Sequence, residues 1–240
     1  MFPIGDENRG IRSRPYVTYA VIAVNVVVFL YQLTLDQFAL VDFILKWGTI
    51  PREISNGQDL FTLITCMFLH GGWLHIAGNM LFLWVFGDNI EDTMGHVRFL
   101  VFYLLCGIAA SGLQVMVNSD SRTPLIGASG AISGVLAAYL VLYPKGKIRT
   151  MILIGIPIMV LIPAWGMIGY WIVIQFINGI ASLGVDTAET NGGVAYFAHI
   201  GGFLAGATLV WVFRDREIQQ RHLDNRARNR AFQRRRVISR

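Results

Sequence analysis

Long apolar runs with few charges recur along this chain, and they restrict its folding more than any other feature. A bilayer core about 30 Å thick needs roughly 20 apolar residues in a helix to cross it. Only 15% of the residues are charged and 54% are hydrophobic, whereas soluble domains carry about 25% charged residues. Four to six such spans would use most of the 240 residues, so we predict one all-α polytopic membrane domain.

The stretch at 150–181 is the ambiguous part of the apolar pattern. Gly155, Pro157 and Pro163 interrupt it, and proline resists continuation of a helix. The stretch therefore fits either one span with an interfacial lead-in or two short spans. The other predicted spans are residues 16–35, 74–90, 97–117, 127–142 and 196–213.

The distribution of positive charge decides between these alternatives. Cytoplasmic loops are enriched in Lys and Arg, so the polar leader (1–14), the segment 145–149 and the arginine-rich tail (214–240) should share the cytoplasmic side. Two spans within 150–181 would put the tail outside. We therefore predict a fifth span at 161–181, six spans in all, and both termini in the cytoplasm. No signal or transit peptide is evident, which favours a bacterial plasma membrane.

Two segments outside the spans carry their own expectations. Residues 36–72 are too charged to cross a membrane and too aromatic for a floppy loop, so we expect a folded cap in the outer interface. The arginine-rich tail fits anionic lipid better than nucleic acid, because it directly follows a membrane exit. Neither segment reveals an oligomeric state.

Polar side chains gather in the first turns of three predicted spans. With the amino terminus inside, the second, fourth and sixth spans all begin at the outer face, and these first turns lie at similar depth. His75 and Asn79 share one face of the second span, Ser129 begins the fourth, and His199 begins the sixth. Polar groups are unfavourable in lipid, so their convergence predicts a functional site.

The chemistry of this layer fits acyl transfer. A serine hydroxyl needs a base to become a nucleophile, and His199 would supply it to Ser129. Oxyanion donors would be the Ser129 backbone N–H, the Asn79 amide and the His75 ring. No carboxylate lies near these first turns, so we predict a dyad whose His199 is oriented by packing alone. We expect no cofactor and no metal.

Two stripes of small residues predict how the fourth and sixth spans pack. The fourth carries Gly130-x-x-x-Gly134, continued by Ala138, and the sixth carries Gly202-x-x-x-Gly206, preceded by Ala198. Small residues spaced in this way let two helix backbones approach closely. If the stripes face each other, Ser129 and His199 meet at the same end.

Three motifs on these spans together resemble the signatures of one known family. Residues 15–213 are similar, in order and spacing, to rhomboid intramembrane serine proteases, and Gly87-x-x-x-Glu91 also matches. The motifs are Gly127-Ala128-Ser129-Gly130, Ala198-His199-x-x-Gly202 and His70-Gly71-Gly72-Trp73-Leu74-His75-x-x-x-Asn79.

The resemblance implies a six-helix bundle with a water-filled cavity open to the outer face. It also implies cleavage of transmembrane segments of other membrane proteins. It assigns Ser129 as nucleophile, His199 as base, and His75 with Asn79 to the oxyanion, while His70 matches an upstream histidine. Some bacterial members place a tyrosine four residues after the serine, where this chain has Ser133. Either Ser133 or an aromatic side chain of the fifth span would then hold the histidine.

Two other readings compete with catalysis. A zinc site would use His70, His75 and His199 as ligands, but there is no H-E-x-x-H motif and no nearby carboxylate. A non-catalytic membrane protein, either a small transporter or a binder of transmembrane helices, is the other alternative. Transporters often show internal repeats, and we find none. At the inner end of the second span, Glu91 is expected to cap or pair, with Arg98 as a candidate partner.

Overall fold

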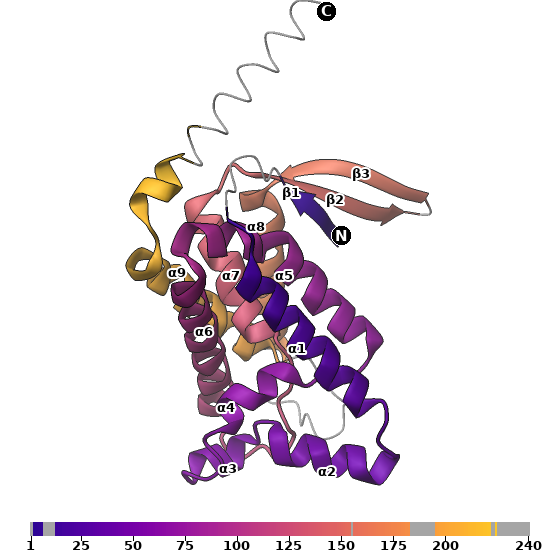
Figure 1. The fold of residues 1–240 in the computed structure, drawn as a ribbon. Coiled ribbons are helices and arrows are strands. Elements are labelled where there is room, and N and C mark those ends of the chain that lie inside the picture. The colour runs from indigo at the N-terminus through magenta and orange to yellow at the C-terminus, as the bar shows by residue number, and fades with distance from the viewer. Residues whose placement is uncertain (1, 7–12, 155, 183–194, 222–223, 225–240) are drawn as a thin grey trace, which may run out of the picture.

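The computed structural model describes residues 2–6, 13–154, 156–182, 195–221 and 224. Most of the arginine-rich tail and the predicted 184–193 loop lie outside these ranges. In the described ranges the chain is mostly helical (Figure 1), and a long helix occupies each predicted span. These helices are α1 (Tyr16–Gln32), α5 (Trp73–Met94), α6 (His96–Val117), α7 (Ser129–Leu142), α8 (Ala164–Ala181) and α9 (Tyr196–Phe213).

The six long helices differ in their fitness to cross a bilayer. By length and composition, α6, α8 and α9 are each long and apolar enough, whereas α1 and α7 are apolar but shorter. Helix α5 has 22 residues, with three carboxylates among its last seven. The predicted polytopic helical fold is therefore confirmed, while the count of six spans stays a prediction.

Helix α7 forms the centre of the bundle. Eleven of its 14 residues are buried, and it contacts α5, α6, α8 and α9. A helix that is apolar on all sides needs such a surrounding layer, because no face of it is suited to water. Ser129, its first residue, therefore begins inside the bundle.

The predicted contact between the two glycine stripes is confirmed. A Cβ atom added at Gly202 would overlap the carbonyl oxygen of Gly130, and one added at Gly206 would overlap the carbonyl oxygen of Gly134. The stripes thus pair in parallel register, as small residues allow. This register brings the first turns of α7 and α9 to one end of the bundle.

Residues 36–72 contain four short helical segments, and we call this part of the chain the cap. Asp36 begins it by accepting a hydrogen bond from the Ala39 backbone, as an N-cap does. At its other end, Gln32 of α1 bonds both backbone groups of His70. The cap covers one end of the bundle (Figure 1), hereafter the cap end. It contains α2 (Gln37–Trp47), α3 (Pro51–Ser55), α4 (Thr62–Thr65) and the 3-10 helix η1 (Cys66–Phe68).

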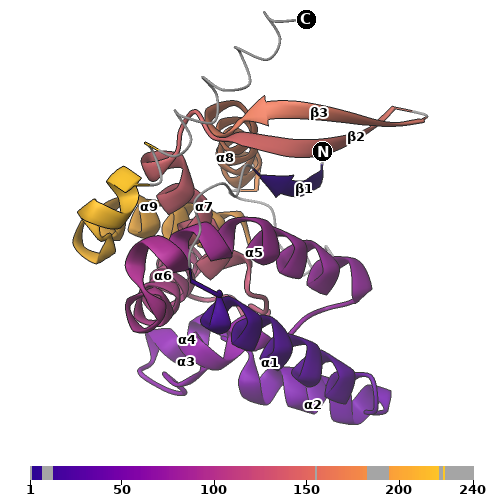
Figure 2. The same cartoon turned by 45° about the horizontal axis from the view of Figure 1, so that its top comes forward.

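A small antiparallel sheet lies at the opposite end, hereafter the sheet end, and the sequence analysis did not predict it. Its strands are β1 (Phe2–Asp6), β2 (Lys147–Ile154) and β3 (Ile156–Pro163), in the order β1-β2-β3. The expected interfacial lead-in to the fifth span is thus a β-hairpin, and α8 starts directly after it. Figure 2 shows this hairpin reaching sideways past the helices.

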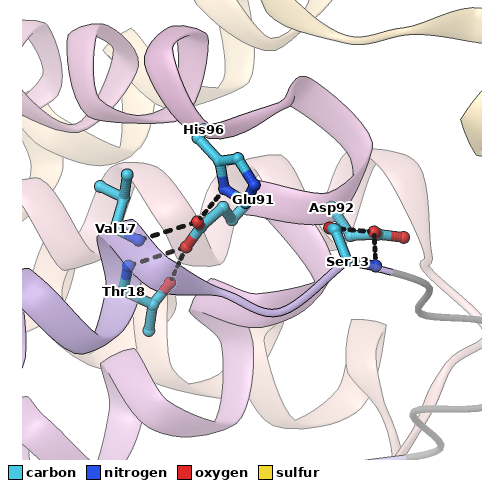
Figure 3. A network of polar contacts seen from close by, with 6 residues as sticks. All are labelled: Ser13, Val17, Thr18, Glu91, Asp92 and His96. Atoms are coloured by element: carbon cyan, nitrogen blue, oxygen red, sulfur yellow. Dashed lines mark hydrogen bonds and ion pairs between the residues drawn. The ribbon is translucent and has the colours of Figure 1, made fainter.

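At the sheet end, the buried Glu91 carboxylate fastens α1 to α5 (Figure 3). It accepts hydrogen bonds from the backbone N–H groups of Val17 and Thr18 at 2.9 and 2.7 Å, and from the Thr18 hydroxyl at 2.7 Å. It also pairs with His96 of α6. Glu91 therefore both caps the start of α1 and pairs with His96. No ion pair with Arg98 is present among the described residues, so the proposed partner was wrong.

Two more carboxylates continue this fastening. Asp92 accepts hydrogen bonds from the backbone and the hydroxyl of Ser13, just before α1. Asp6 of β1 accepts from the Asn89 amide of α5 at 3.0 Å and from the Tyr139 hydroxyl of α7 at 2.6 Å. The amino-terminal segment is thereby joined to the bundle by side chains as well as by the sheet.

Candidate active site

A cavity of about 1030 Å³ enters the bundle at the cap end, and its walls are mainly apolar. Side chains from α5, α7, α8, α9 and the cap line it. No carboxylate is among its described lining residues. The polar and aromatic side chains that the argument uses are Ser129, His199, His75, Asn79 and Trp171.

Ser129 and His199 meet in this cavity. Ser129 is the first residue of α7 and His199 the fourth of α9, so the parallel glycine register sets them at the same level. The Nε2 atom of His199 lies 2.8 Å from the Ser129 hydroxyl oxygen. That distance is a hydrogen bond, and it is the geometry that a serine and its general base require.

Gln175 of α8 holds the other side of the His199 ring. Its side-chain oxygen lies 2.7 Å from Nδ1 of His199, and its amide nitrogen donates to the Trp171 carbonyl at 3.3 Å. The oxygen accepts, so Nδ1 carries the proton and Nε2 presents its lone pair to Ser129. The expectation that packing alone orients His199 was wrong. A polar side chain inside a predicted span was the available signal.

Trp171 and Ser133 are the two kinds of side chain expected to hold the His199 ring, and only Trp171 contacts it. The Trp171 ring centroid lies 5.6 Å from that of His199, at an interplanar angle of 38°. The Ser133 hydroxyl instead donates to the Ser129 carbonyl within α7, at 2.6 Å. Of the two expected alternatives, the aromatic of the fifth long apolar segment is the one that packs on His199.

His75 faces the serine through a glycine loop. Its Nδ1 accepts the Gly71 backbone N–H at 3.3 Å, so the neutral ring carries its proton on Nε2. A Cβ atom at Gly127 would lie 2.7 Å from this Nε2. Gly127 has φ +121°, a conformation that only glycine adopts without strain. The loop before Ser129 therefore passes directly over the His75 donor.

Asn79 completes the group with an unpaired donor. Only 7% of the residue is exposed, and its amide nitrogen has no hydrogen-bond acceptor in the described part of the chain. Buried donors are almost always paired. An unpaired one beside a cavity therefore marks the place where an acceptor of a bound molecule would sit.

His70 lies behind His75 rather than in the cavity lining. Their rings pack edge to face with centroids 5.0 Å apart. Burial, with a smaller contribution from His75, lowers the pKa of His70 to about 4, so its ring is neutral near pH 7. Within the described ranges, no group of three or more His, Cys, Asp or Glu side chains is arranged to hold a metal ion.

Comparison with known proteins adds an independent observation to this geometry. The model of the Rhomboid domain matches residues 57–216, a range that contains all four candidate site residues. The chain belongs to the rhomboid family. With its long apolar helices, this rhomboid is an integral membrane protein.

Two curated relatives align with most of this rhomboid chain. Rhomboid protein 1, mitochondrial, of Saccharomyces cerevisiae is 28% identical over 90% of the chain and 58% of its own length. Rhomboid protease GluP of Bacillus subtilis is 30% identical over 82% of the chain and 35% of its own length. A third, RHOMBOID-like protein 5 of Arabidopsis thaliana, is 34% identical over 40% of the chain. The chain thus spans about a third to three fifths of the length of the first two relatives.

Proposed function

We propose that this chain is an intramembrane serine endopeptidase, which hydrolyses peptide bonds in or near transmembrane segments of other membrane proteins. The observation that carries the proposal is the 2.8 Å contact between His199 Nε2 and the Ser129 hydroxyl inside an apolar cavity. The relative GluP, which is named as a protease, supports the same reaction class.

In the proposed reaction, His199 moves one proton in each of two half-reactions, first from Ser129 to the leaving amine and then from water to Ser129. The Ser129 oxygen attacks the scissile carbonyl carbon while His199 Nε2 takes the hydroxyl proton. His199 then gives this proton to the leaving amine, and an acyl ester remains on Ser129. Water then attacks the ester while His199 takes one of its protons, and His199 returns this proton to the Ser129 oxygen as the carboxylic acid product leaves and ionises.

Three donors are proposed to stabilise the oxyanion of the tetrahedral intermediate. They are the Asn79 amide nitrogen, the His75 Nε2–H and the Ser129 backbone N–H. The unpaired state of the Asn79 donor and the Nδ1 acceptance of His75 support the first two. The third sits at the start of α7, where the helix dipole favours negative charge. Preorganised donors of this kind act most strongly where water is excluded.

Gln175 is proposed as a positioning residue in place of the carboxylate of a triad. Its neutral oxygen fixes the tautomer of His199 without adding a charge to an apolar cavity. The dyad depends on this role, because a histidine in the wrong tautomer presents N–H, not a lone pair, to the serine.

The proposed topology follows from the two ends of the bundle. The leader (1–14) and the tail (214–240) would lie in the cytoplasm at the sheet end, and the protease domain (15–213) would open its cavity to the outer face. The tail would contact anionic lipid. The proposed location is the plasma membrane of a bacterium, with transmembrane proteins as substrates.

The test compares two serines on the same helix. Wild type, Ser129→Ala and Ser133→Ala are each reconstituted in liposomes with a single-span substrate protein, and cleavage is followed over time. Ser129→Ala should abolish cleavage and fluorophosphonate labelling. Ser133→Ala removes only a hydroxyl bonded within α7, so it should keep most of both. Equal cleavage by wild type and Ser129→Ala would falsify the proposal.

A further inference from the structure

The β2–β3 hairpin projects beyond the part of the molecule that supports it. Its strands pair along their whole length, from Lys147 with Pro163 to Ile154 with Ile156. Strand β1 pairs only with residues 148–151 of β2. The distal half of the hairpin (152–154 and 156–159) therefore reaches past both β1 and the helices, as Figures 1 and 2 show.

One face of the hairpin packs on the bundle near its base. Ile148 and Thr150 have no exposed surface, and the Thr150 hydroxyl lies 3.6 Å from the sulfur of Met167 in α8. Alternate residues of a strand share a face, so this face continues into the distal half. There Ile158 is 40% exposed and Ile156 is 69% exposed. The apolar face that covers the bundle thus runs on past its edge.

The opposite face is apolar at the tip as well. Leu153 and Met159, which belong to it, are 58% and 57% exposed. Apolar side chains thus project from both faces of the distal half. A ribbon exposed in this way in water would be prone to aggregate.

The charged side chains of the hairpin itself have one sign, whereas the Asp6 carboxylate of the adjoining β1 is bonded to α5 and α7. Lys145, Lys147 and Arg149 are exposed, and residues 144–163 contain no carboxylate. Basic side chains next to an apolar surface fit the headgroups of anionic lipid. The charges therefore indicate what kind of surface covers the apolar tip.

We propose that the distal half of the hairpin lies in the lipid interface beside the bundle, with the three basic side chains contacting anionic headgroups. Its depth is limited, because an open strand edge cannot enter the hydrocarbon core. Pro157 and Pro163 give β3 two positions without an N–H donor, which makes it a poor template for another strand. A lipid surface is therefore favoured over a second protein strand.

The proposal is tested with a fluorescent label at the tip in lipid nanodiscs, where both faces are open to solvent. An NBD group is attached to Ile156→Cys, and in a second variant to Met159→Cys. The native Cys66 and Cys106 are buried and should not label. Two quenchers are compared: lipid brominated near the headgroup, and aqueous iodide.

Two control positions calibrate the quenching. Leu204→Cys on α9 is 53% exposed on an apolar helix and reports lipid. Asp120→Cys lies in the exposed turn that follows α6, and reports water. The brominated lipid should quench both tip labels at least twofold more than it quenches the Asp120 label. Iodide should quench both tip labels less than it quenches the Asp120 label. Strong iodide quenching at the tip would overturn the proposal, as would protection from both quenchers, which would indicate a protein contact.

The anionic part has a separate arm. Nanodiscs of phosphatidylglycerol are compared with nanodiscs of phosphatidylcholine. The tip-labelled protein is used with Lys147 and Arg149 intact, and again with the double substitution Lys147→Gln/Arg149→Gln. Lipid quenching of the tip label should be stronger in phosphatidylglycerol, and the double substitution should remove that difference. Equal quenching in both lipids, with Lys147 and Arg149 intact, would overturn the proposed contact with anionic headgroups. Neither arm depends on proteolysis.

Discussion

At the sheet end of the bundle, the Glu91 carboxylate accepts three hydrogen bonds from α1 and pairs with His96 (Figure 3). At the cap end, the Asn79 amide nitrogen is equally buried but has no acceptor among the described residues. Both groups are carried by α5, about three turns apart. One end of this helix therefore has its polar groups satisfied, and the other does not.

This difference separates a structural role from a functional one. A buried polar network that is fully bonded rigidifies a fold, whereas an unpaired donor destabilises it. The Asn79 donor differs from other buried groups in lining the cavity, where a bound molecule can supply its acceptor. Substitutions at the sheet end should therefore reduce stability, and those at the cap end should reduce activity. The first three predictions below test that division.

The largest effect is expected from Glu91→Ala. It leaves the first N–H groups of α1 without their acceptor in a buried site, at a cost of about 3–5 kcal/mol in stability. The measurement is thermal unfolding in detergent. The rate of substrate cleavage per folded molecule is measured in parallel. Glu217→Ala, at an exposed ion pair with Arg221, should change stability by less than about 1 kcal/mol. If Glu91→Ala unfolded at the same temperature as wild type, the contacts of Glu91 would not stabilise the fold as we infer.

Asn79→Ala should do the reverse. Loss of one oxyanion donor lowers kcat by about 10²–10³, while removal of an unpaired buried amide leaves stability unchanged or raised. The matched control is Asn25→Ala in α1, whose amide nitrogen, unlike that of Asn79, has an acceptor, the Val21 carbonyl, and which lies away from the cavity. It should lower stability and spare kcat. A parallel fall in stability and kcat for Asn79→Ala would mean that its role is structural.

Substitutions of Gln175 test whether this side chain positions His199 at the cap end. Gln175→Leu should lower kcat by about 10- to 100-fold, as loss of an orienting group does elsewhere, with little change in KM. Gln175→Glu keeps an acceptor for Nδ1 of His199 and should recover most of the rate. Asn178→Leu, the other amide substitution in α8, should leave kcat within twofold. A loss in Gln175→Glu as large as in Gln175→Leu would argue against positioning.

The sequence predicts the parts of this fold that depend on one helix or on one spacing. The long helices follow from apolar runs, and the contact between α7 and α9 follows from residues four apart, such as Gly130 with Gly134. Ser129 and His199 then come together because both begin their helices at one end. These features need no knowledge of distant side chains.

The missed features depend on partners that lie far away in the sequence. Gln175 bonds a histidine 24 residues later, and only the packing of α8 on α9 decides that contact. The hairpin was hidden because its distal half is apolar on both faces, so no alternation of polarity marks it. One signal was present: isoleucine or valine occupies most even positions from Ile148 to Ile162, and β-branched residues favour strands.

The smallest predicted effect concerns His70, which lies at the cap end and has no partner for either ring nitrogen among the described residues. Its folded pKa of about 4 is below the ordinary value near 6.5, so the folded state favours the neutral ring. That contribution is complete above pH 6.5 and is lost as the pH falls toward 4. At pH 5.5 the loss is about 1.4 kcal/mol.

His70→Phe keeps an aromatic ring against His75 and removes the titrating group. The bonds from Gln32 go to the backbone of His70, so they survive the change. Unfolding in detergent should therefore be compared at pH 7.5 and pH 5.5 for the two proteins. Wild type should lose more stability than His70→Phe over this interval. Equal losses would show that the unpaired ring is already charged or hydrated, and that the cap end is less dry than its unpaired groups indicate.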